Sequence, residues 1–416
     1  MIKKIGNAIR QNKVVLVNFS FLGILQLSNL IIFLILIPYL YRVLGEENYG
    51  LVVFAQTVAI YFSIIINYGY NVTATRDISV NRDNIHKRSE IISQVLLIKI
   101  TLFILSFLFL SLLILALKLF RDHPTLFYFS MIACLSEALF PIWYFQGIEK
   151  MKYITFINVS SRILSAFLIF IFVRTQSDYS LVPLLLGAGT LIGAFTGLYI
   201  VFFRHHNSMV LLSLSFLFLK VKENFPVFIS NVSSQIYVNA NKIIIGSLMG
   251  VREVAQYDIA DRLVNLAKVP FFVLGQALFP DISRKKNIKY INNVMIILIG
   301  VAFIISALVI VFAPSLVSLM TGQEDENIIM ALRVLILSII PVTISLFYTD
   351  LRLIPFGYYA EFAKTRIISL IVYALLIVLL IISKRLSSVC FVWTIVMVES
   401  FVAFIAFFYC RERKIC

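Results

Sequence analysis

The sequence is a series of long apolar runs, each ended by a short cluster of charged and turn-forming residues. The runs reach the roughly 18 or more residues that a helix needs to cross the hydrocarbon core of a bilayer. Because the bilayer interior offers no water to free backbone groups, uniformly apolar runs of this length predict helices and not barrel strands. We predict twelve membrane-spanning helices, over residues 14–41, 49–71, 90–117, 125–145, 153–173, 180–203, 224–249, 254–279, 291–320, 328–350, 360–383 and 388–409.

Composition argues against the main alternative, a soluble enzyme. Hydrophobic residues make up 61% of the chain and charged residues 14%, and the mean hydropathy is +0.96. Soluble chains carry about 45–50% apolar and about 25% charged residues. The predicted spans and their short loops use nearly all of the 416 residues, so no room is left for a catalytic domain. We expect a protein that is not an enzyme.

The distribution of Lys and Arg predicts the orientation of the chain. Of the 36 basic residues, 23 lie in the N-terminal segment and every second loop after it, whereas 7 lie in the opposite set of loops. Cytoplasmic loops of membrane proteins collect Lys and Arg, so both termini are predicted to be cytoplasmic. The same rule explains the net charge of +15, so we do not expect nucleic acid as a partner.

The loops also suggest how the chain is divided. We predict an N-terminal six-helix bundle over 1–203, a cytoplasmic connecting loop over 204–223 and a C-terminal six-helix bundle over 224–416. In each half, the first helix is followed by an outer turn that contains glycine, Gly45 in one and Gly250 in the other. This weak internal repeat is typical of transporters built from two pseudo-symmetric halves. The four cysteines and four histidines show no metal-ligand spacing, so we expect neither a metal site nor a bound cofactor.

Polar residues inside the predicted spans are the candidate functional residues, because they are costly in lipid. Asn231, Gln235, Asn239 and Lys242 follow one another at steps of four, four and three, which places them on one helical face. Such a stripe faces protein or water. Further polar positions that can line one cavity with it are Asn18, Gln26, Asn29, Gln56, Ser63, Asn67, Asp258, Asp261, Arg262, Asn265 and Lys268.

Structural explanations compete with this interpretation. Buried amides also hold membrane helices together, and Asp258 with Arg262 is an i,i+4 pair that can neutralise itself. Lys242 has no acidic partner in its own helix, which makes it the isolated charge of the set. Snorkelling accounts for Lys99 at least as well as a function does. Glu137 and Glu399 can carry protons or pair with these bases, and the sequence leaves both options open.

Three stretches resemble the Wzx-type O-antigen flippases, which belong to a superfamily that also includes lipid II flippases and MATE drug exporters. They are PYLYRVLGEENYG at 38–50, YGYNVTATR at 68–76 and FPIWYFQGIEKMK at 140–152, of which the third is the most specific. Weaker similarities are found at 228–230 and 279–283. The resemblance runs along the whole chain in the same order. It implies an all-α membrane protein with two helix bundles around a central cavity.

The resemblance also implies a function. It implies a bacterial inner-membrane protein that moves undecaprenyl-pyrophosphate-linked repeat units from the cytoplasmic to the periplasmic leaflet by alternating access, working beside a polymerase or ligase of the same polysaccharide pathway. Cations in the cavity then meet the pyrophosphate, and we match Lys242 and Arg76 to that role. Two alternatives stay open, a MATE-like cation or drug antiporter and a membrane glycosyltransferase or O-antigen polymerase. The short outer loops weigh against the enzyme.

Overall fold

The computed structural model describes residues 2–383 and 387–415, except for the side chains of residues 2–20, 22, 230, 231, 233–238, 277, 280 and 281. Every regular element in these ranges is helical, as the hydrophobic pattern predicts. The first ten helices are α1 (Ile2–Asn67), α2 (Tyr70–Val80), α3 (Ile85–Ala116), α4 (Lys118–Asp122), α5 (Pro124–Leu139), α6 (Ile142–Gly147), α7 (Met151–Phe172), α8 (Leu181–Tyr199), α9 (Leu214–Leu248) and α10 (Val251–Lys285). The others are α11 (Ile288–Thr321), α12 (Glu326–Leu335), α13 (Ile339–Tyr348), α14 (Tyr359–Ile382) and α15 (Ser388–Glu412), with short 3₁₀ segments η1 (Gln176–Ser180) and η3 (Ile336–Ser338) and π-helical segments η2 (Ile200–Arg204) and η4 (Thr349–Leu353).

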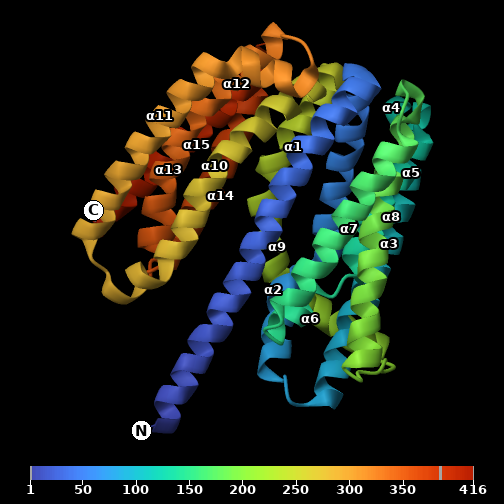
Figure 1. The fold of residues 1–416 in the computed structure, drawn as a ribbon, viewed down its shortest axis with the longest axis vertical. Helices are drawn as coiled ribbons and strands as arrows, with labels where there is room; N and C mark the ends of the chain where they lie inside the picture. The colour runs from blue at the N-terminus through green and yellow to red at the C-terminus, as the bar shows by residue number, and fades with distance from the viewer. Residues whose placement is uncertain (1, 384–386, 416) are drawn as a thin grey trace. The chain divides into compact units, whose positions relative to one another are not determined.

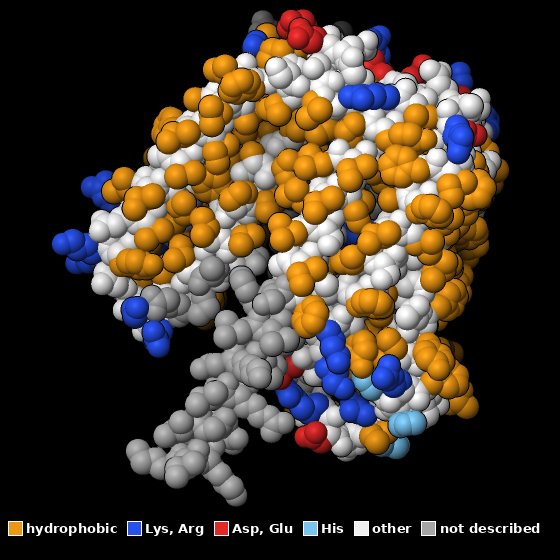
Figure 2. Space-filling view, in the orientation of Figure 1, with side chains coloured by type: hydrophobic (Ala, Val, Ile, Leu, Met, Phe, Trp, Pro, Cys, Tyr) orange, Lys and Arg blue, Asp and Glu red, His pale blue; other side chains and the backbone are white. Residues whose placement is uncertain are grey.

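Within the described residues, nine helical segments are long and apolar enough to cross a membrane. One of them, Gly23–Val80, contains the predicted span 49–71 and most of the predicted span 14–41, and α9 and α10 are not among the nine. Figure 2 shows hydrophobic side chains along the middle of the visible helices and charged side chains gathered toward their ends. The chain is therefore an all-α, multi-pass membrane protein, whereas the number of twelve spans remains a prediction.

The chain forms two compact units. Unit 1 contains Met1–Asn48 and Ala55–Gln235, and unit 2 contains Tyr49–Phe54 and Ile236–Cys416. Most of the expected loop over 204–223 is helical, because α9 begins at Leu214. The charged residues that suggested a loop there form an i,i+3 ion pair on the helix, Lys220 with Glu223 at 2.8 Å.

Unit 1 has α3, α5, α7 and α8 packed side by side (Figure 1). The turn predicted at Gly45 is present, since this residue interrupts α1 with a φ of 74° that favours glycine. The turn is held by Asn48, whose side-chain amide donates a hydrogen bond to the carbonyl oxygen of Gln176 at 3.1 Å. In unit 2 the corresponding turn also contains a glycine with positive φ, Gly250 at 133°.

The most specific motif of the sequence, residues 140–152, lies in the core of unit 1. Trp143, Tyr144 and Phe145 are fully buried on the short helix α6. A β-carbon on Gly147 would lie 2.6 Å from a side-chain carbon of Ile78 on α2, so glycine lets α6 and α2 approach closely. The motif is thus explained first by packing.

His205 connects this core to the end of α8 and gives a pH-dependent prediction. Its Nδ1 lies 3.1 Å from the hydroxyl of Tyr144, and burial, with the nearby charges of Lys150, Arg88 and Arg204, lowers its pKa to about 4. The unfolded chain binds this proton near pH 6.5, so stability is lost as the pH falls from 6.5 toward 4. We expect a loss on the order of 1 kcal/mol, since the ring is partly exposed. Thermal unfolding of detergent-purified protein across this range measures it.

The control for this prediction is the neighbouring histidine. His205→Gln should flatten the pH dependence, because glutamine can accept the Tyr144 hydrogen bond without titrating. His206 is exposed, so His206→Gln should leave the slope as in the wild type. Equal slopes for all three proteins would disprove the assignment.

Unit 2 is formed mainly by α10 to α15, which run alongside one another in Figure 1. One cluster of its core joins Phe271 and Ile282 of α10 to Leu298 of α11 and Phe347 of α13. The π-helical segment η4 follows α13 and carries two charged residues, Asp350 and the fully buried Arg352. Because π-helical turns are frequent at functional sites, η4 is a candidate position for such a site in unit 2.

Candidate functional site

The predicted charged residues of α9 and α10 meet in one network inside unit 2. Lys242 Nζ lies 2.8 Å from Asp258 Oδ1 and 3.0 Å from Asp261 Oδ2. Arg262 Nε lies 2.5 Å from Asp258 Oδ2, which is the i,i+4 pair that the sequence suggested. The Asp258 carboxylate is fully buried. Its negative charge is therefore removed from water, and the ion pairs with Lys242 and Arg262 compensate for that cost.

A tyrosine far away in sequence completes the network. The hydroxyl of Tyr49 donates a hydrogen bond of 2.7 Å to Asp258 Oδ2. Tyr49 belongs to the short segment Tyr49–Phe54 that packs within unit 2. Nothing in the spacing of the sequence points to a contact across 209 residues, so this member of the network was not predictable.

The segment Tyr49–Phe54 is held in place by two glycines. A β-carbon on Gly50 would lie 1.8 Å from the carbonyl oxygen of Val251, at the start of α10. A β-carbon on Gly246 would lie 2.3 Å from the ring of Phe54. Both distances are far below van der Waals contact, so glycine is required at both positions. The close approach is what brings the Tyr49 hydroxyl to Asp258.

The network corrects one expectation. Lys242 is not an isolated charge, because it is bound by two carboxylates of the next helix, and its side chain is only 12% exposed. The expectation was wrong because pairing was sought within α9, while its partners lie on α10. The assignment of Lys242 and Arg76 to a pyrophosphate stays a prediction. Arg76 is exposed and pairs with its neighbour Asp77 at 2.8 Å.

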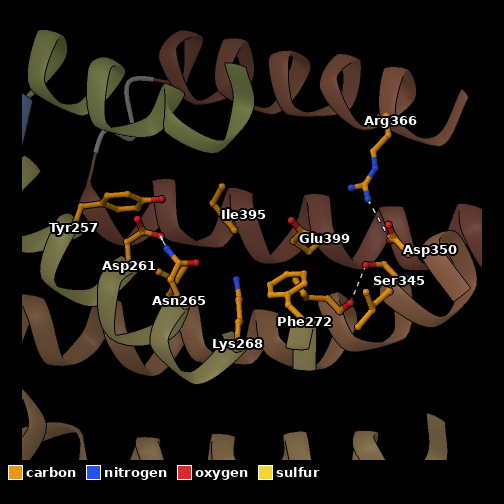
Figure 3. A pocket seen from close by; sticks show the side chains of 13 residues that line it. Tyr257, Asp261, Asn265, Lys268, Phe272, Ser345, Asp350, Arg366, Ile395 and Glu399 are labelled. Carbon is orange, nitrogen blue, oxygen red and sulfur yellow. Dashed lines mark hydrogen bonds and ion pairs between the residues drawn. The ribbon is translucent and has the colours of Figure 1, made fainter. Parts of the chain in front are cut away.

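A cavity of about 300 Å³ lies beside this network, within unit 2 (Figure 3). Three predicted residues of α10 line it, Asp261, Asn265 and Lys268. Asn265 donates a hydrogen bond to Asp261 Oδ1 at 3.0 Å. The other lining residues are Tyr257, Phe272, Leu335, Val342, Ser345, Leu346, Asp350, Arg366, Ile395 and Glu399.

A second polar cavity, of about 450 Å³, lies within unit 1. It is lined by Asn67, Asn71, Ser63 and Glu137 together with apolar residues. Asn67 donates a hydrogen bond of 2.9 Å to Glu137 Oε1. Lys99 does not snorkel to the membrane surface, because its side chain is fully buried, and its Nζ lies 3.8 Å from Glu137 Oε1. Glu137 therefore pairs with a base, one of the two options that the sequence left open.

The remaining predicted residues are placed as follows. Gln26 is exposed, and Asn29, Gln56 and Asn239 are half-buried. The side chains of Asn18, Asn231 and Gln235 lie outside the described residues. The structure thus brings together the polar residues of α10 with Lys242, and it adds Tyr49, Asp350, Arg366 and Glu399 to them.

Glu399 was noticed in the sequence as an intramembrane charge. Asp350 and Arg366 were missed because they fall at predicted span ends, where charges are ordinary.

Metal chemistry has no candidate in the part of the chain that the structure describes, where no three His, Cys, Asp or Glu side chains are grouped as ligands. The donors that meet in unit 2 are carboxylates neutralised by Lys and Arg. What the arrangement offers is hydrogen bonding and charge inside an apolar helical shell, which suits the passage or binding of a polar solute.

The fold has relatives among solved structures. The lipid II flippase MurJ in an inward closed conformation matches with a TM-score of 0.73 and 14% identity, over 93% of this chain and 87% of that chain. A MATE family multidrug resistance transporter of the MOP superfamily, in an inward-facing conformation, matches with a TM-score of 0.65 and 15% identity, over 91% and 96% of the two chains. The fold is that of MOP-superfamily transporters.

Sequence comparison is more specific. An Escherichia coli (strain K12) protein named "Putative O-antigen transporter" is 30% identical over 357 residues, which cover 83% of this chain and 85% of that protein. A Shigella dysenteriae protein of the same name is 27% identical over 365 residues, with 86% and 91% covered. The family model described as "Polysaccharide biosynthesis protein" matches residues 15–286.

Fold and buried polar groups together define a multi-pass membrane protein with the fold seen in MOP-superfamily transporters. Within that class, the chain belongs to the polysaccharide biosynthesis protein family. The resemblance seen in the three sequence stretches is thereby confirmed.

Proposed function

We propose that the protein is a flippase for lipid-linked oligosaccharides, which moves undecaprenyl-pyrophosphate-linked O-antigen repeat units from the cytoplasmic to the periplasmic leaflet of the bacterial inner membrane. The observation that carries the proposal is the 30% identity with the Escherichia coli relative along most of both chains. In this proposal the chain has twelve spans with both termini in the cytoplasm, as the Lys and Arg distribution predicts.

The physics of such a task agrees with the observed interior. Each sugar hydroxyl that enters hydrocarbon without a partner costs roughly 4–8 kcal/mol, so the path has to supply hydrogen-bonding groups. Both units contain cavities lined in part by polar side chains. We propose alternating access as the mechanism. Outward movement of a pyrophosphate is favoured by a negative cell interior, by roughly 2.3 kcal/mol per charge per 100 mV.

The drug-antiporter alternative has a weaker basis. The MATE family transporter shares the fold with this chain at 15% identity. A likeness at that level does not indicate that the two proteins have the same substrates. A cation exporter also needs an excess of acidic groups. The carboxylates of the unit 2 cavity, Asp261, Asp350 and Glu399, are matched by Lys268 and Arg366 in its lining and by Lys242 on Asp261.

Deletion of the gene in its host tests the proposal. Lipid-linked repeat units should accumulate on the cytoplasmic face of the inner membrane and surface polysaccharide should be lost. A membrane-impermeant glycosidase added to spheroplasts reports the face, and a plasmid copy of the gene should restore the polymer. Unpolymerised units on the outer face would instead indicate a polymerase. Normal surface polysaccharide with altered drug tolerance would favour the antiporter.

A further inference from the structure

The unit 2 cavity contains two charged side chains with no partner among the described residues. Lys268 of α10 and Glu399 of α15 both line it. In Figure 3 the interactions drawn join Asp261 to Asn265, Asp350 to Arg366 and the Ser345 hydroxyl to a backbone oxygen, and none ends at Lys268 or Glu399. The two groups line the same cavity, yet the described residues contain no ion pair between them.

The other charges of the cavity are already neutralised. Asp261 is bound by Lys242 at 3.0 Å. Asp350 lies 3.6 Å from Arg366 and accepts a hydrogen bond of 2.6 Å from the hydroxyl of Thr349. The free groups are therefore one ammonium and one carboxylate, with no net charge between them.

Unpaired charges inside a membrane helix bundle are costly unless water or a ligand solvates them. A fitting ligand offers both hydrogen-bond donors, for Glu399, and acceptors, for Lys268. It carries no large charge of its own, because Lys268 and Glu399 together have no net charge with which to neutralise one. A neutral polyhydroxylated molecule satisfies both conditions.

The lining and the size of the cavity further restrict which neutral polyhydroxylated ligand it can bind. Phe272 lines the cavity and is 45% exposed, so it offers apolar surface that the apolar face of a sugar can contact. The volume of about 300 Å³ equals that of roughly ten waters and lies at the lower end for small-molecule sites. It fits one sugar ring and not a complete lipid-linked repeat unit.

We propose that this cavity is the glycan subsite of the transporter, where Lys268 and Glu399 hydrogen-bond the hydroxyl groups of one neutral sugar ring and Phe272 contacts its apolar face. The inference rests on the proposed function and deepens it, since it assigns the cavity to the sugar and excludes the pyrophosphate from it. Hydrogen bonds to charged groups are among the stronger ones, so the sugar contributes measurably to affinity.

A two-ligand binding experiment tests the subsite. The full-length protein, purified in detergent, is titrated with undecaprenyl pyrophosphate and with the lipid-linked repeat unit extracted from the host's deletion strain, and binding is followed by native mass spectrometry. The wild type should bind the sugar-bearing lipid at least about tenfold more tightly than the bare lipid. Lys268→Met and Glu399→Gln should bring this ratio close to one while leaving affinity for the bare lipid unchanged.

The control variants are Lys289→Met and Glu412→Gln, which remove exposed charges of the same types elsewhere in unit 2 and should keep the wild-type ratio. Phe272→Leu keeps all charges and should lower the ratio severalfold, so it serves if a charge variant does not fold. Loss of affinity for both lipids in equal measure, or a wild-type ratio in Lys268→Met, Glu399→Gln and Phe272→Leu, would overturn the subsite. A wild type that binds neither lipid would overturn the flippase proposal itself.

Discussion

Replacing Asp258 with alanine should destabilise the folded protein by about 3–5 kcal/mol, because it removes a buried anion that two cations share. Lys242 would keep only Asp261, and the guanidinium of Arg262 would lose its partner at 2.5 Å. The hydroxyl of Tyr49 would lose its acceptor as well. Thermal unfolding of the detergent-purified variant, together with its level in the membrane, measures the effect.

The same network ranks a set of related variants. Lys242→Met should cost less than Asp258→Ala, because Asp258 would still be bound by Arg262 and Tyr49. The double variant Lys242→Met with Asp258→Asn should lose less stability than the sum of the losses in the two single variants. In the double variant both residues are neutral, so neither of the two is left as a charge without the other. If the two single changes are additive, Lys242 and Asp258 are not coupled and the network is not the stabilising unit described above.

Gly50→Ala should be among the most damaging single-methyl changes in this chain. The added β-carbon would lie 1.8 Å from a backbone oxygen, that of Val251, and a backbone atom cannot rotate away as a side chain can. Overpacking usually costs about 1–3 kcal/mol, and we expect the upper end of that range or more. The Tyr49–Asp258 hydrogen bond should be lost with it, because the segment Tyr49–Phe54 has to move.

The matched control is Gly300→Ala. Gly300 is also inside a helix, α11, and, apart from the neighbouring backbone of that helix, no atom lies within 4 Å of the position its β-carbon would take. Alanine there should be neutral or slightly stabilising, given its higher helix propensity. Comparing the two variants in unfolding temperature separates close packing from propensity. Equal melting temperatures would show that Gly50 is not tightly packed in the membrane-embedded protein.

The fold was predictable from the sequence wherever the signal is a local one. The apolar runs correctly indicated helices throughout the described residues, and the turn at Gly45 lies where the sequence placed it. The prediction was less accurate at 204–223, because Lys220, Lys222 and Glu223 resemble a loop in composition although α9 already begins at Leu214. A charged stretch near the start of a long helix and a charged loop have the same composition, and without tertiary contacts the sequence does not distinguish them.

The candidate site was predictable only in part, and the reason is physical. Spacing on one helix showed that Asp258, Asp261, Asn265 and Lys268 share α10 and correctly paired Asp258 with Arg262. It could not show which neighbouring helix supplies a counter-charge, so Lys242 looked isolated and Lys99 looked like a snorkelling residue. Both are paired with acidic residues of other helices. Pairing between helices depends on tertiary structure, which a single sequence does not contain.

The composition of α10 has a consequence for how the protein is made. Asp258, Asp261, Arg262 and Lys268 lie on this one helix, and each charge costs roughly 2.5–3.5 kcal/mol at the centre of a bilayer. We therefore expect α10 to leave the translocon poorly when it is alone. It needs Lys242 from α9 beside it, so the two helices should enter the lipid as a hairpin. Ribosome-bound chains that end directly after α10 should be extracted from membranes by alkali more readily than chains that end after α15.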